Sequence, residues 1–372
     1  MQINESHVLS FRARRGHLAG PGAHSPVEAA RAVVGIQAQI ESPALWAMAM
    51  RTQGRPTAEA LLSEIFAARS LVRTWAQRDT LHLYPAQDWP LVAAADPLWP
   101  STSRFGALAS EHALAATRVR LADRVVTRAE VFDLVTEAMH AEMAARVGDA
   151  QAPRYAAGRL FWQLAHRGEV CQGPMVGAEQ GYVARSFWLP DLHFPTHDAT
   201  EAAIELTRRY LAVNGPASPK DVAHFFGARV TEVRRWFAAL SPELVEVVCP
   251  GHADLFVLAA DTEALRADDA PPPPRLLAGY DTLLMAHADK TWTVPVAGET
   301  KAIWRPSAVV AAIVLAGGRA VGVWTQKKTK KAVQISVAPL SQWRPEYLTA
   351  LEADAQALAT HLGLAEATLS VA

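Results

Sequence analysis

The chain has 372 residues, with 36 basic and 37 acidic side chains, and its formal net charge of −1 does not by itself indicate a nucleic-acid partner. Half of the residues are hydrophobic, as in an ordinary globular protein, and no apolar run reaches the roughly 18 residues of a membrane helix. The first residues lack an apolar core of signal-peptide length, and two cysteines cannot build a disulfide framework. We therefore expect a cytoplasmic protein without a membrane partner.

The sequence predicts one arrangement of elements three times: two or three helices followed by two short strands. In the first copy a helix begins at Ser25 and Pro26, because a serine cap, a proline at the first position and Glu28 mark a helix start. A second helix over residues 57–70 follows. Two strands then occupy residues 71–84, where polar and leucine side chains alternate.

The second copy begins with a helix from Thr127, where Glu130 completes a capping box, and continues with a helix over residues 155–168. Its two strands cover residues 169–174 and 180–186. The third copy has helices over 199–215, 218–227 and 229–240 and strands over 244–249 and 254–259. A short helix, a tight turn, a second helix and a hairpin are typical of a winged helix-turn-helix, which usually binds nucleic acid.

A proline stretch over residues 266–277 predicts a stiff linker, after which the chain becomes rich in short strands and ends in a helix over roughly 345–362. Strands are expected within residues 275–287, 290–295, 307–315, 319–326 and 331–340, with a turn at Gly317 and Gly318. The predicted fold class is α+β, with three tandem winged helix-turn-helix motifs and a small C-terminal β-barrel-like domain. The expected domain bounds are 1–120, 121–195, 196–268 and 269–372.

The usual chemical motifs do not occur in the sequence. There is no HExxH, no close Cys/His pair, no GxSxG, no phosphate-binding loop and no dinucleotide-binding glycine pattern, so we expect neither a metal nor a cofactor. Cys171 and Cys249 lie among apolar, strand-like neighbours, which favours inert burial over catalysis.

Two glutamines, Gln37 and Gln39, lie among apolar residues and are the remaining candidates for chemistry. A helix from Pro26 would place Gln37 on the apolar face, where a buried amide needs a partner. Gln39 would lie at the frayed helix end before Pro43. Spacing alone favours a structural interpretation, in which a buried glutamine satisfies a free carbonyl at the helix end, and leaves the functional one open.

The whole chain resembles the winged-helix DNA glycosylases of the AlkZ and YcaQ type. Five segments carry the resemblance in the expected order, between about residue 11 and residue 340: VVGIQAQIESPALWAMAMR, LVRTWAQRDTLHLY, RLFWQLAHRGEV, LLAGYDTLLMAHADKTW and VVAAIVLAGGRAVGVWTQKK. The resemblance implies three tandem winged helices and a small β-domain. It also implies excision of alkylated purines such as N7-alkylguanine and N3-alkyladenine, including bulky natural-product adducts and interstrand crosslinks, in base excision repair or self-resistance.

The catalytic signature of that family is Gln, an apolar residue, then Gln or Asp, and here Gln37, Ala38 and Gln39 occupy it. The chain therefore resembles the Gln/Gln branch of the AlkZ type, with a middle residue smaller than usual. Asp79 stands where glycine is more usual. The resemblance therefore favours the functional interpretation of the two glutamines and implies that they are the catalytic residues.

Neutral amides suit this reaction, because alkylation at N7 of guanine or N3 of adenine makes the base cationic and activates the glycosidic bond. The enzyme then has mainly to position a water and stabilise an oxocarbenium-like sugar. No lysine lies near the signature to form a Schiff base, so we expect a monofunctional glycosylase without lyase activity.

Three further groups are candidates for contacts with double-stranded DNA that carries alkylated bases. Trp75, Arg78, Thr80 and His82 are expected to line the catalytic cleft, although core packing is an equal alternative for the tryptophan. His287, Lys290, Thr291 and Trp292 could engage phosphate or the minor groove. Lys327, Lys328, Lys330 and Lys331 form a phosphate-positioning patch, with a solvated turn as the alternative.

We expect the protein to act as a monomer. The main functional alternative is a non-enzymatic winged-helix DNA-binding protein such as a transcription regulator. Three tandem units, the paired glutamines and the lack of an evident dimerisation coiled coil argue against that alternative.

Overall fold

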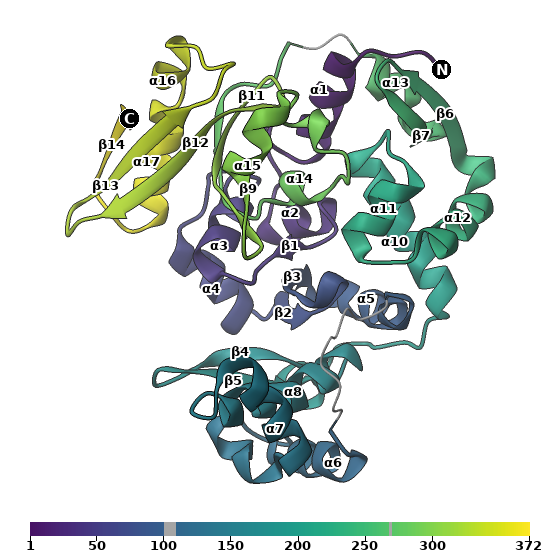
Figure 1. The fold of residues 1–372 in the computed structure, drawn as a ribbon, viewed down its shortest axis with the longest axis vertical. Helices are drawn as coiled ribbons and strands as arrows, with labels where there is room; N and C mark the ends of the chain where they lie inside the picture. Colours follow the sequence, from purple (N-terminus) through teal and green to yellow (C-terminus); the bar gives the residue numbers. More distant parts are fainter. Residues whose placement is uncertain (100–108, 268–269) are drawn as a thin grey trace. The chain divides into compact units, whose positions relative to one another are not determined.

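The structure is a computed structural model that describes residues 1–99, 109–267 and 270–372 (Figure 1). The fold is α+β, and the chain divides into two compact units. The discontinuous unit comprises Met1–Leu62 and Ile204–Ala372, and the continuous unit comprises Ser63–Ala203. The four sequence-based domain bounds describe repeated motifs rather than compact units, and they stay a prediction.

In the continuous unit an antiparallel sheet joins the two hairpins that the sequence predicts for the first and second copies. The strands lie side by side in the order β3-β2-β4-β5, and Arg73 of β2 pairs with Gln172 of β4. Leu160, Phe161 and Leu164 of α8 pack against this sheet, and the ring of Phe161 stacks on Tyr182 at 4.0 Å between centroids. The elements of this unit are β2 (Leu71–Trp75), β3 (Leu81–Pro85), α5 (Trp89–Ala95), α6 (Glu111–Arg120), α7 (Glu137–Val147), α8 (Ala152–His166), β4 (Val170–Val176), β5 (Glu179–Ala184) and α9 (Arg185–Trp188).

The helix expected from Thr127 does not form as one element. Thr127 does use Glu130 as predicted, because its backbone N–H donates to the carboxylate at 2.7 Å. The chain then makes only a 3-10 turn over Ala129–Leu134, and α7 begins at Glu137 with Thr136 as its cap. Val135 has an extended backbone, so the helical pattern is interrupted there and Thr136 can act as the cap of a new helix. The pattern predicted as one helix is therefore divided between the 3-10 turn and α7.

The helices of the discontinuous unit begin largely where their capping residues predict. Ser25 caps α2, and Ser218 and Asp221 form a complete capping box at the start of α11. The third copy has the expected order of three helices and a hairpin. The elements up to this hairpin and its following helix are α1 (Glu5–Arg15), α2 (Pro26–Ala32), β1 (Ile36–Gln37), α3 (Glu41–Ala49), α4 (Ala58–Phe66), α10 (Ala199–Asn214), α11 (Pro219–Phe226), α12 (Val230–Ala239), β6 (Leu244–Cys249), β7 (His252–Leu258) and α13 (Thr262–Arg266).

The C-terminal region forms a five-stranded half-barrel sheet in the order β14-β13-β12-β11-β8, which has two edges and is not a closed barrel (Figure 1). Its strands are antiparallel except for the parallel pair β13 and β14. Gly317 and Gly318 make the predicted turn with φ of 58° and 81°. The elements are β8 (Arg275–Leu277), α14 (Thr282–Met285), α15 (Thr300–Ile303), β9 (Trp304–Arg305), β10 (Val309–Val310), β11 (Ile313–Ala316), β12 (Arg319–Lys328), β13 (Ala332–Pro339), α16 (Glu346–Ala350), α17 (Glu352–His361) and β14 (Glu366–Val371).

Three sequence-based expectations for this region are wrong. The chain ends in the strand β14 rather than in a helix, because a turn at Gly363 brings the last residues alongside β13. Residues 282–285 are helical, and Lys290–Trp292 form a 3-10 turn instead of a strand. Pro271–Pro274 have neither helix nor strand, as expected, but both flanks belong to the discontinuous unit. The proline stretch is therefore a connection within one unit.

Candidate active site and DNA-contacting residues

The segment that contains Gln37 and Gln39 connects α2 to α3 with a non-helical backbone. α2 ends at Ala32, because Val34 and Gly35 have φ of 56° and 90°, a left-handed conformation that a right-handed helix cannot continue. Ile36 and Gln37 form the short strand β1, and α3 begins at Glu41. The expected helix through Gln37 is therefore wrong. Pro43 does not end a helix either; it lies in the first turn of α3.

The three signature residues differ in burial. Gln37 is buried with 9% of its surface exposed, Ala38 is fully buried, and Gln39 is exposed. The motif thus presents one shielded and one accessible amide, each able to donate and accept hydrogen bonds without a charge.

The hairpin turn between β2 and β3 contains Arg78 and Asp79, both in the left-handed region with φ of 59° and 57°. Asp79 is the position at which the resembling family more usually has glycine, and a positive φ gives the physical reason for that preference. Arg78 is half-buried, and burial lowers its pKa to about 10, so it stays cationic at neutral pH. The Thr80 hydroxyl donates to the Gln77 carbonyl at 3.3 Å.

His82 and Trp75 are packed more tightly than the strand alternation suggests. His82 is 1% exposed, its Nδ1 lies 3.0 Å from the Thr80 carbonyl, and burial with the nearby Arg78 charge lowers its pKa to about 3. It is therefore a neutral imidazole near pH 7. Trp75 is half-buried and stacks on Tyr182 at 5.9 Å between centroids, which agrees with the packing alternative.

Gln77 is a candidate that the sequence analysis missed. Its side chain is 1% exposed, and its Oε1 accepts from the Tyr84 hydroxyl at 2.7 Å. Its Nε2 donor has no hydrogen-bond partner among the described residues. The sequence gives no signal for this placement, because a glutamine in a hairpin turn usually faces water.

The signature and the hairpin residues belong to different compact units. Gln37 and Gln39 lie in the discontinuous unit, whereas Trp75, Arg78, Thr80 and His82 lie in the continuous unit. Within its own unit, each set occupies one short stretch of chain. Their convergence in one cleft stays a prediction.

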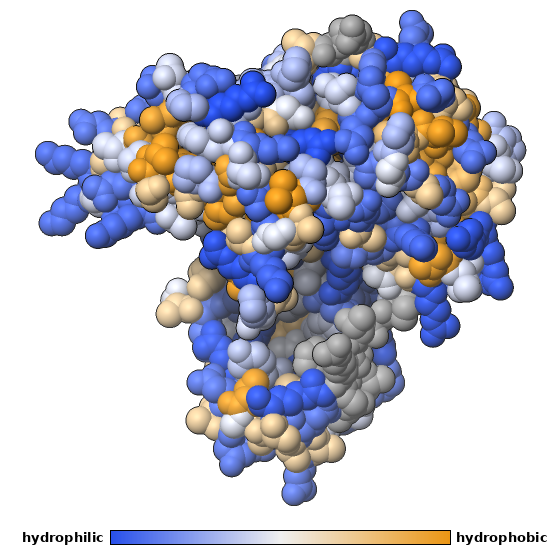
Figure 2. All heavy atoms as spheres, turned by 45° about the horizontal axis from the view of Figure 1, so that its top comes forward, coloured by the Kyte–Doolittle hydropathy of each residue, from blue (hydrophilic) through white to orange (hydrophobic). Residues whose placement is uncertain are grey.

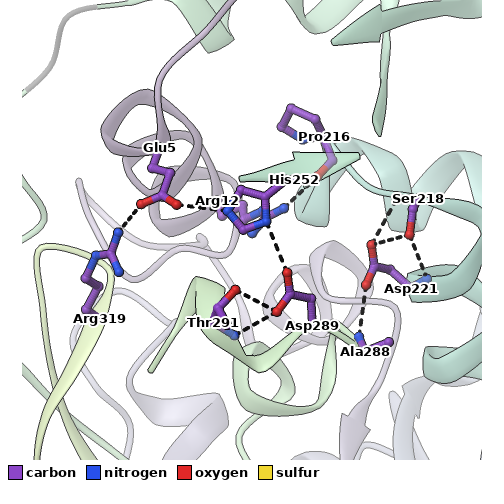
Figure 3. Close-up of polar contacts among 10 residues, drawn as sticks. All are labelled: Glu5, Arg12, Pro216, Ser218, Asp221, His252, Ala288, Asp289, Thr291 and Arg319. Atoms are coloured by element: carbon purple, nitrogen blue, oxygen red, sulfur yellow. Dashed lines mark hydrogen bonds and ion pairs between the residues drawn. The ribbon is translucent and has the colours of Figure 1, made fainter. Parts of the chain in front are cut away.

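The segment from His287 to Trp292 is held by intramolecular contacts, and Figure 3 shows those of Ala288, Asp289 and Thr291. His287 is 7% exposed, and its Nε2 lies 3.0 Å from the Asn214 carbonyl. Lys290 donates from Nζ to the carbonyl of His287 at 2.6 Å, and its Nζ lies 5.0 Å from the ring centre of Trp304. Thr291 is exposed and donates from both its backbone N–H and its hydroxyl to Asp289, which also contacts His252.

Trp292 lies at the centre of this cluster with 2% of its surface exposed. His252 stacks on it at 3.5 Å between ring centroids, and the Arg12 guanidinium lies 4.2 Å from its ring centre. Arg12 also donates to the carbonyls of Asn214 and Pro216, and burial lowers its pKa to about 10. Of the four residues predicted in this segment, Thr291 is the one most accessible to DNA, and a role in DNA binding stays a prediction for the set.

Lys327, Lys328, Lys330 and Lys331 are all exposed, at the tip of the hairpin that β12 and β13 form (Figure 1). None of them has an ion-pair partner within the described part of the chain. Figure 2 shows hydrophilic side chains at the outermost edge of the C-terminal half-barrel region, on the left of the view. This arrangement leaves four cations available to a polyanion.

The two cysteines and the potential metal ligands show no sign of a further chemical site in the described part of the chain. Cys171 and Cys249 are buried free thiols, as expected, and burial raises the pKa of Cys171 to about 12. Among the residues that the structure describes, no three His, Cys, Asp or Glu side chains gather as a metal site would require. No helix in that part of the chain has the length and apolarity to cross a membrane.

Comparison with known proteins identifies the class. The sequence model of the family described as "DNA glycosylase AlkZ-like" matches residues 30–361, which is most of the chain. The protein is therefore a DNA glycosylase, an enzyme that removes bases from DNA. More particularly, it belongs to the AlkZ-like family, as the resemblance in the sequence implied.

Two comparisons support this assignment. A protein of Streptomyces sahachiroi named "Interstrand DNA cross-link repair glycosylase" is 30% identical over 341 residues, covering 87% of this chain and 88% of the relative. The solved structure of "Streptomyces sahachiroi DNA glycosylase AlkZ" has a similar fold, with a TM-score of 0.82, 24% identity and full coverage of both chains. Family membership decides against a non-enzymatic regulator.

Proposed function

We propose that this enzyme hydrolyses the N-glycosidic bond of purines alkylated at ring nitrogens, N7-alkylguanine and N3-alkyladenine. We propose further that it accepts bulky natural-product adducts and unhooks interstrand crosslinks, in base excision repair or self-resistance. The name of the Streptomyces sahachiroi relative, an interstrand DNA cross-link repair glycosylase, supports the crosslink activity. The observation that carries the proposal is the pair of neutral amides, Gln37 and Gln39, on either side of the buried Ala38.

The proposed chemistry needs only what these amides can supply. An alkylated purine is a cationic leaving group, so its departure needs little general-acid catalysis. One glutamine accepts a hydrogen bond from the attacking water through its carbonyl oxygen, and the other donates an N–H to the nucleoside. The water oxygen bonds to C1′ and its surplus proton passes to solvent, while the purine leaves as a neutral base with the electron pair of the glycosidic bond. The shielded position of Gln37 strengthens such contacts, because little water competes there.

The described residues also support a monofunctional reaction. A lyase step needs an amine nucleophile that forms a Schiff base with the opened sugar. Position 220 holds the first lysine of the chain, and the other six lie between Lys290 and Lys331. The proposal is therefore base release that leaves an abasic site with both strands intact.

The substrate is double-stranded DNA, which we propose the enzyme binds as a monomer in the bacterial cytoplasm, on the nucleoid. Each predicted copy contributes helices followed by a hairpin, and we propose that all three are winged helix-turn-helix motifs. The exposed lysines of the β12–β13 hairpin would contact phosphates.

A duplex with a single N7-methylguanine tests the proposal. Incubation with the enzyme should produce strand breaks at that position after alkali treatment and none before it. Parallel duplexes should contain N3-methyladenine and a nitrogen-mustard crosslink between N7 atoms. Binding of all three without alkali-dependent breaks would exclude the proposed activity, and breaks before alkali would exclude a monofunctional reaction.

A further inference from the structure

The discontinuous unit contains a pocket of about 420 Å³ whose role the glycosylase reaction does not explain. This appendage pocket, as we call it, lies where α3, α17 and the half-barrel sheet meet. Its volume is in the range of small-molecule sites, roughly 300–1,000 Å³. The lining residues are Ser42, Pro43, Trp46, Ala278, Gly279, Tyr280, Val310, Ala312, Trp324, Thr325, Gln326, Leu358, His361 and Leu362.

The floor of the appendage pocket is aromatic, and its polar atoms are turned away from the space. Trp46 donates from Nε1 to the Leu276 carbonyl at 2.7 Å, and Trp324 donates from Nε1 to the carbonyls of Leu277 and Ile313. Both indoles are at most 5% exposed. Because their N–H groups are already satisfied, these indoles offer an occupant apolar ring carbons and no free hydrogen-bond donor.

No formal charge lines the appendage pocket. None of its lining residues, all within the described part of the chain, is Asp, Glu, Lys or Arg. His361 is 2% exposed, its Nδ1 lies 2.8 Å from the Pro56 carbonyl, and burial lowers its pKa, so the ring is neutral near pH 7. A charged group would lose its hydration in this pocket without gaining a counter-charge.

The rim is polar and close to the catalytic signature along the chain. Ser42, Thr325 and Gln326 are exposed at the entrance, whereas the aromatic floor is buried. Ser42 follows Gln39 by three residues, so their Cα atoms are at most about 11 Å apart. The entrance therefore lies within about 11 Å of the signature, measured between these two Cα atoms.

We propose that the appendage pocket binds the planar, uncharged aromatic part of a bulky adduct whose alkylated base is held at Gln37 and Gln39. This proposal rests on the proposed excision of bulky adducts and adds the class of substrate that the site selects. An unmodified nucleobase is also planar, and Lys328, two residues from Gln326 and hence on the same face of β12, is a cation beside the entrance, so a nucleoside is the competing occupant to be tested.

The blocking variant is Gln326→Trp. Gln326 is exposed and lies two residues from Trp324 on β12, so both side chains point to the same face of the sheet. An indole there fills the entrance without disturbing a buried contact. The matched control is Gln334→Trp, because Gln334 is exposed on β13 opposite Lys327 and hence on the other face.

Two measurements test the proposal. In the first, quinoline is titrated into each protein by isothermal titration calorimetry, with adenosine as the comparison ligand. Quinoline should bind the wild type, Gln37→Ala and Gln334→Trp alike and should bind Gln326→Trp at least about tenfold more weakly. Equal binding of adenosine and quinoline would assign the pocket to a DNA base and overturn the proposal, as would quinoline binding that Gln326→Trp does not weaken.

In the second measurement, kcat/KM is compared for duplexes with an N7-(quinolylmethyl)guanine and an N7-methylguanine. The ratio of the two values should fall about tenfold in Gln326→Trp and stay unchanged in Gln334→Trp. An unchanged ratio in Gln326→Trp would overturn the proposal even if both adducts are excised. Failure of the wild type to excise either adduct would instead contradict the proposed function, while the calorimetry would still decide whether the pocket binds an aromatic ligand.

Discussion

At the scale of single residues, Gln37 and Gln39 differ in accessibility, and this difference sets the expected effects of their replacement. Gln37→Ala and Gln39→Ala should each reduce the single-turnover rate of N7-methylguanine release by about 100-fold or more, which is the usual loss when one preorganised polar contact to the reacting centre is removed. Duplex affinity should change by less than about threefold, because phosphate contacts dominate it.

Gln53→Ala serves as the control for these two variants, because Gln53 is an exposed glutamine of the same unit whose amide donates to the Gly22 carbonyl. Its rate should equal that of the wild type. Rates of base release that match the wild type in both signature variants would remove the two glutamines from the catalytic assignment.

His82 gives the molecule a dependence of stability on pH. Burial lowers the pKa of the folded-state imidazole to about 3, below its ordinary value of 6.5. Between these values the unfolded chain binds the proton and the folded chain does not, so stability is full above pH 6.5 and decreases as the pH falls. At about pH 5 the loss from this group is about 2 kcal/mol.

His82→Asn removes this titration while an amide N–H can still donate to the Thr80 carbonyl. The unfolding free energy, measured by urea titration, should decrease between about pH 7.5 and pH 5 by about 2 kcal/mol less in the variant than in the wild type. Parallel decreases in the two proteins would show that His82 is protonated in the folded state.

The residue types of the candidate site were predictable, but their backbone was not. The signature follows from the residue pattern and the family resemblance. The end of α2 depends on Val34 in a left-handed conformation, which is rare for a β-branched side chain, so no local propensity predicts it. The burial of Trp292 and His287 depends on Arg12 and Asn214, which are far from them in sequence.

At the scale of elements, local signals predicted helix starts better than helix ends or strand pairing. Ser25, Ser218 and Asp221 act as caps because the cap interaction lies within three or four residues. The strand β14 was missed because its partner β13 lies some 30 residues earlier and its own pattern is short. Pairing of this kind depends on tertiary contacts, which periodicity does not report.

A buried ion pair joins the turn that follows α3 to the N-cap of α14 within the discontinuous unit. Arg51 and Asp281 are at most 1% exposed, their side chains form two hydrogen bonds of 2.8 and 2.7 Å, and Asp281 also caps α14 through Leu283 N–H. Asp281→Ala leaves the guanidinium buried without its carboxylate. The unfolding free energy should fall by about 3–5 kcal/mol, as measured by urea titration.

The double variant Arg51→Met with Asp281→Leu tests whether the loss comes from the unpaired charge. It should recover most of the stability that Asp281→Ala loses, because apolar side chains of similar volume need no counter-charge. A double variant as unstable as the single one would indicate that the cap on α14 and packing volume, rather than the charge, account for the effect.

At the scale of the whole molecule, the sequence predicted the family and the α+β class but not the compact units. The strands of the first and second copies join in one sheet through Arg73 and Gln172, so contacts cross the boundary that the repeats suggest. The proline stretch marks a composition break, yet Trp46 donates to the Leu276 carbonyl in β8, at the end of that stretch, and links α3 to the half-barrel sheet. Composition reports the course of the chain, whereas compact units depend on which segments pack together.

DNA binding is a property of the whole molecule, and the exposed lysines of the β12–β13 hairpin should contribute to it through counterion release. Each phosphate contact adds about 0.9 to the slope of log affinity against log salt concentration. Lys328→Gln should therefore reduce the slope by about 0.9, and replacement of Lys327, Lys328, Lys330 and Lys331 together by up to about 3.6. The measurement is fluorescence anisotropy of an undamaged duplex at several salt concentrations.

Lys301→Gln is the control, because Lys301 is an exposed lysine of α15 outside the hairpin, and it should leave the slope unchanged. An unchanged slope in the fourfold variant would mean that the hairpin is a solvated turn without phosphate contacts.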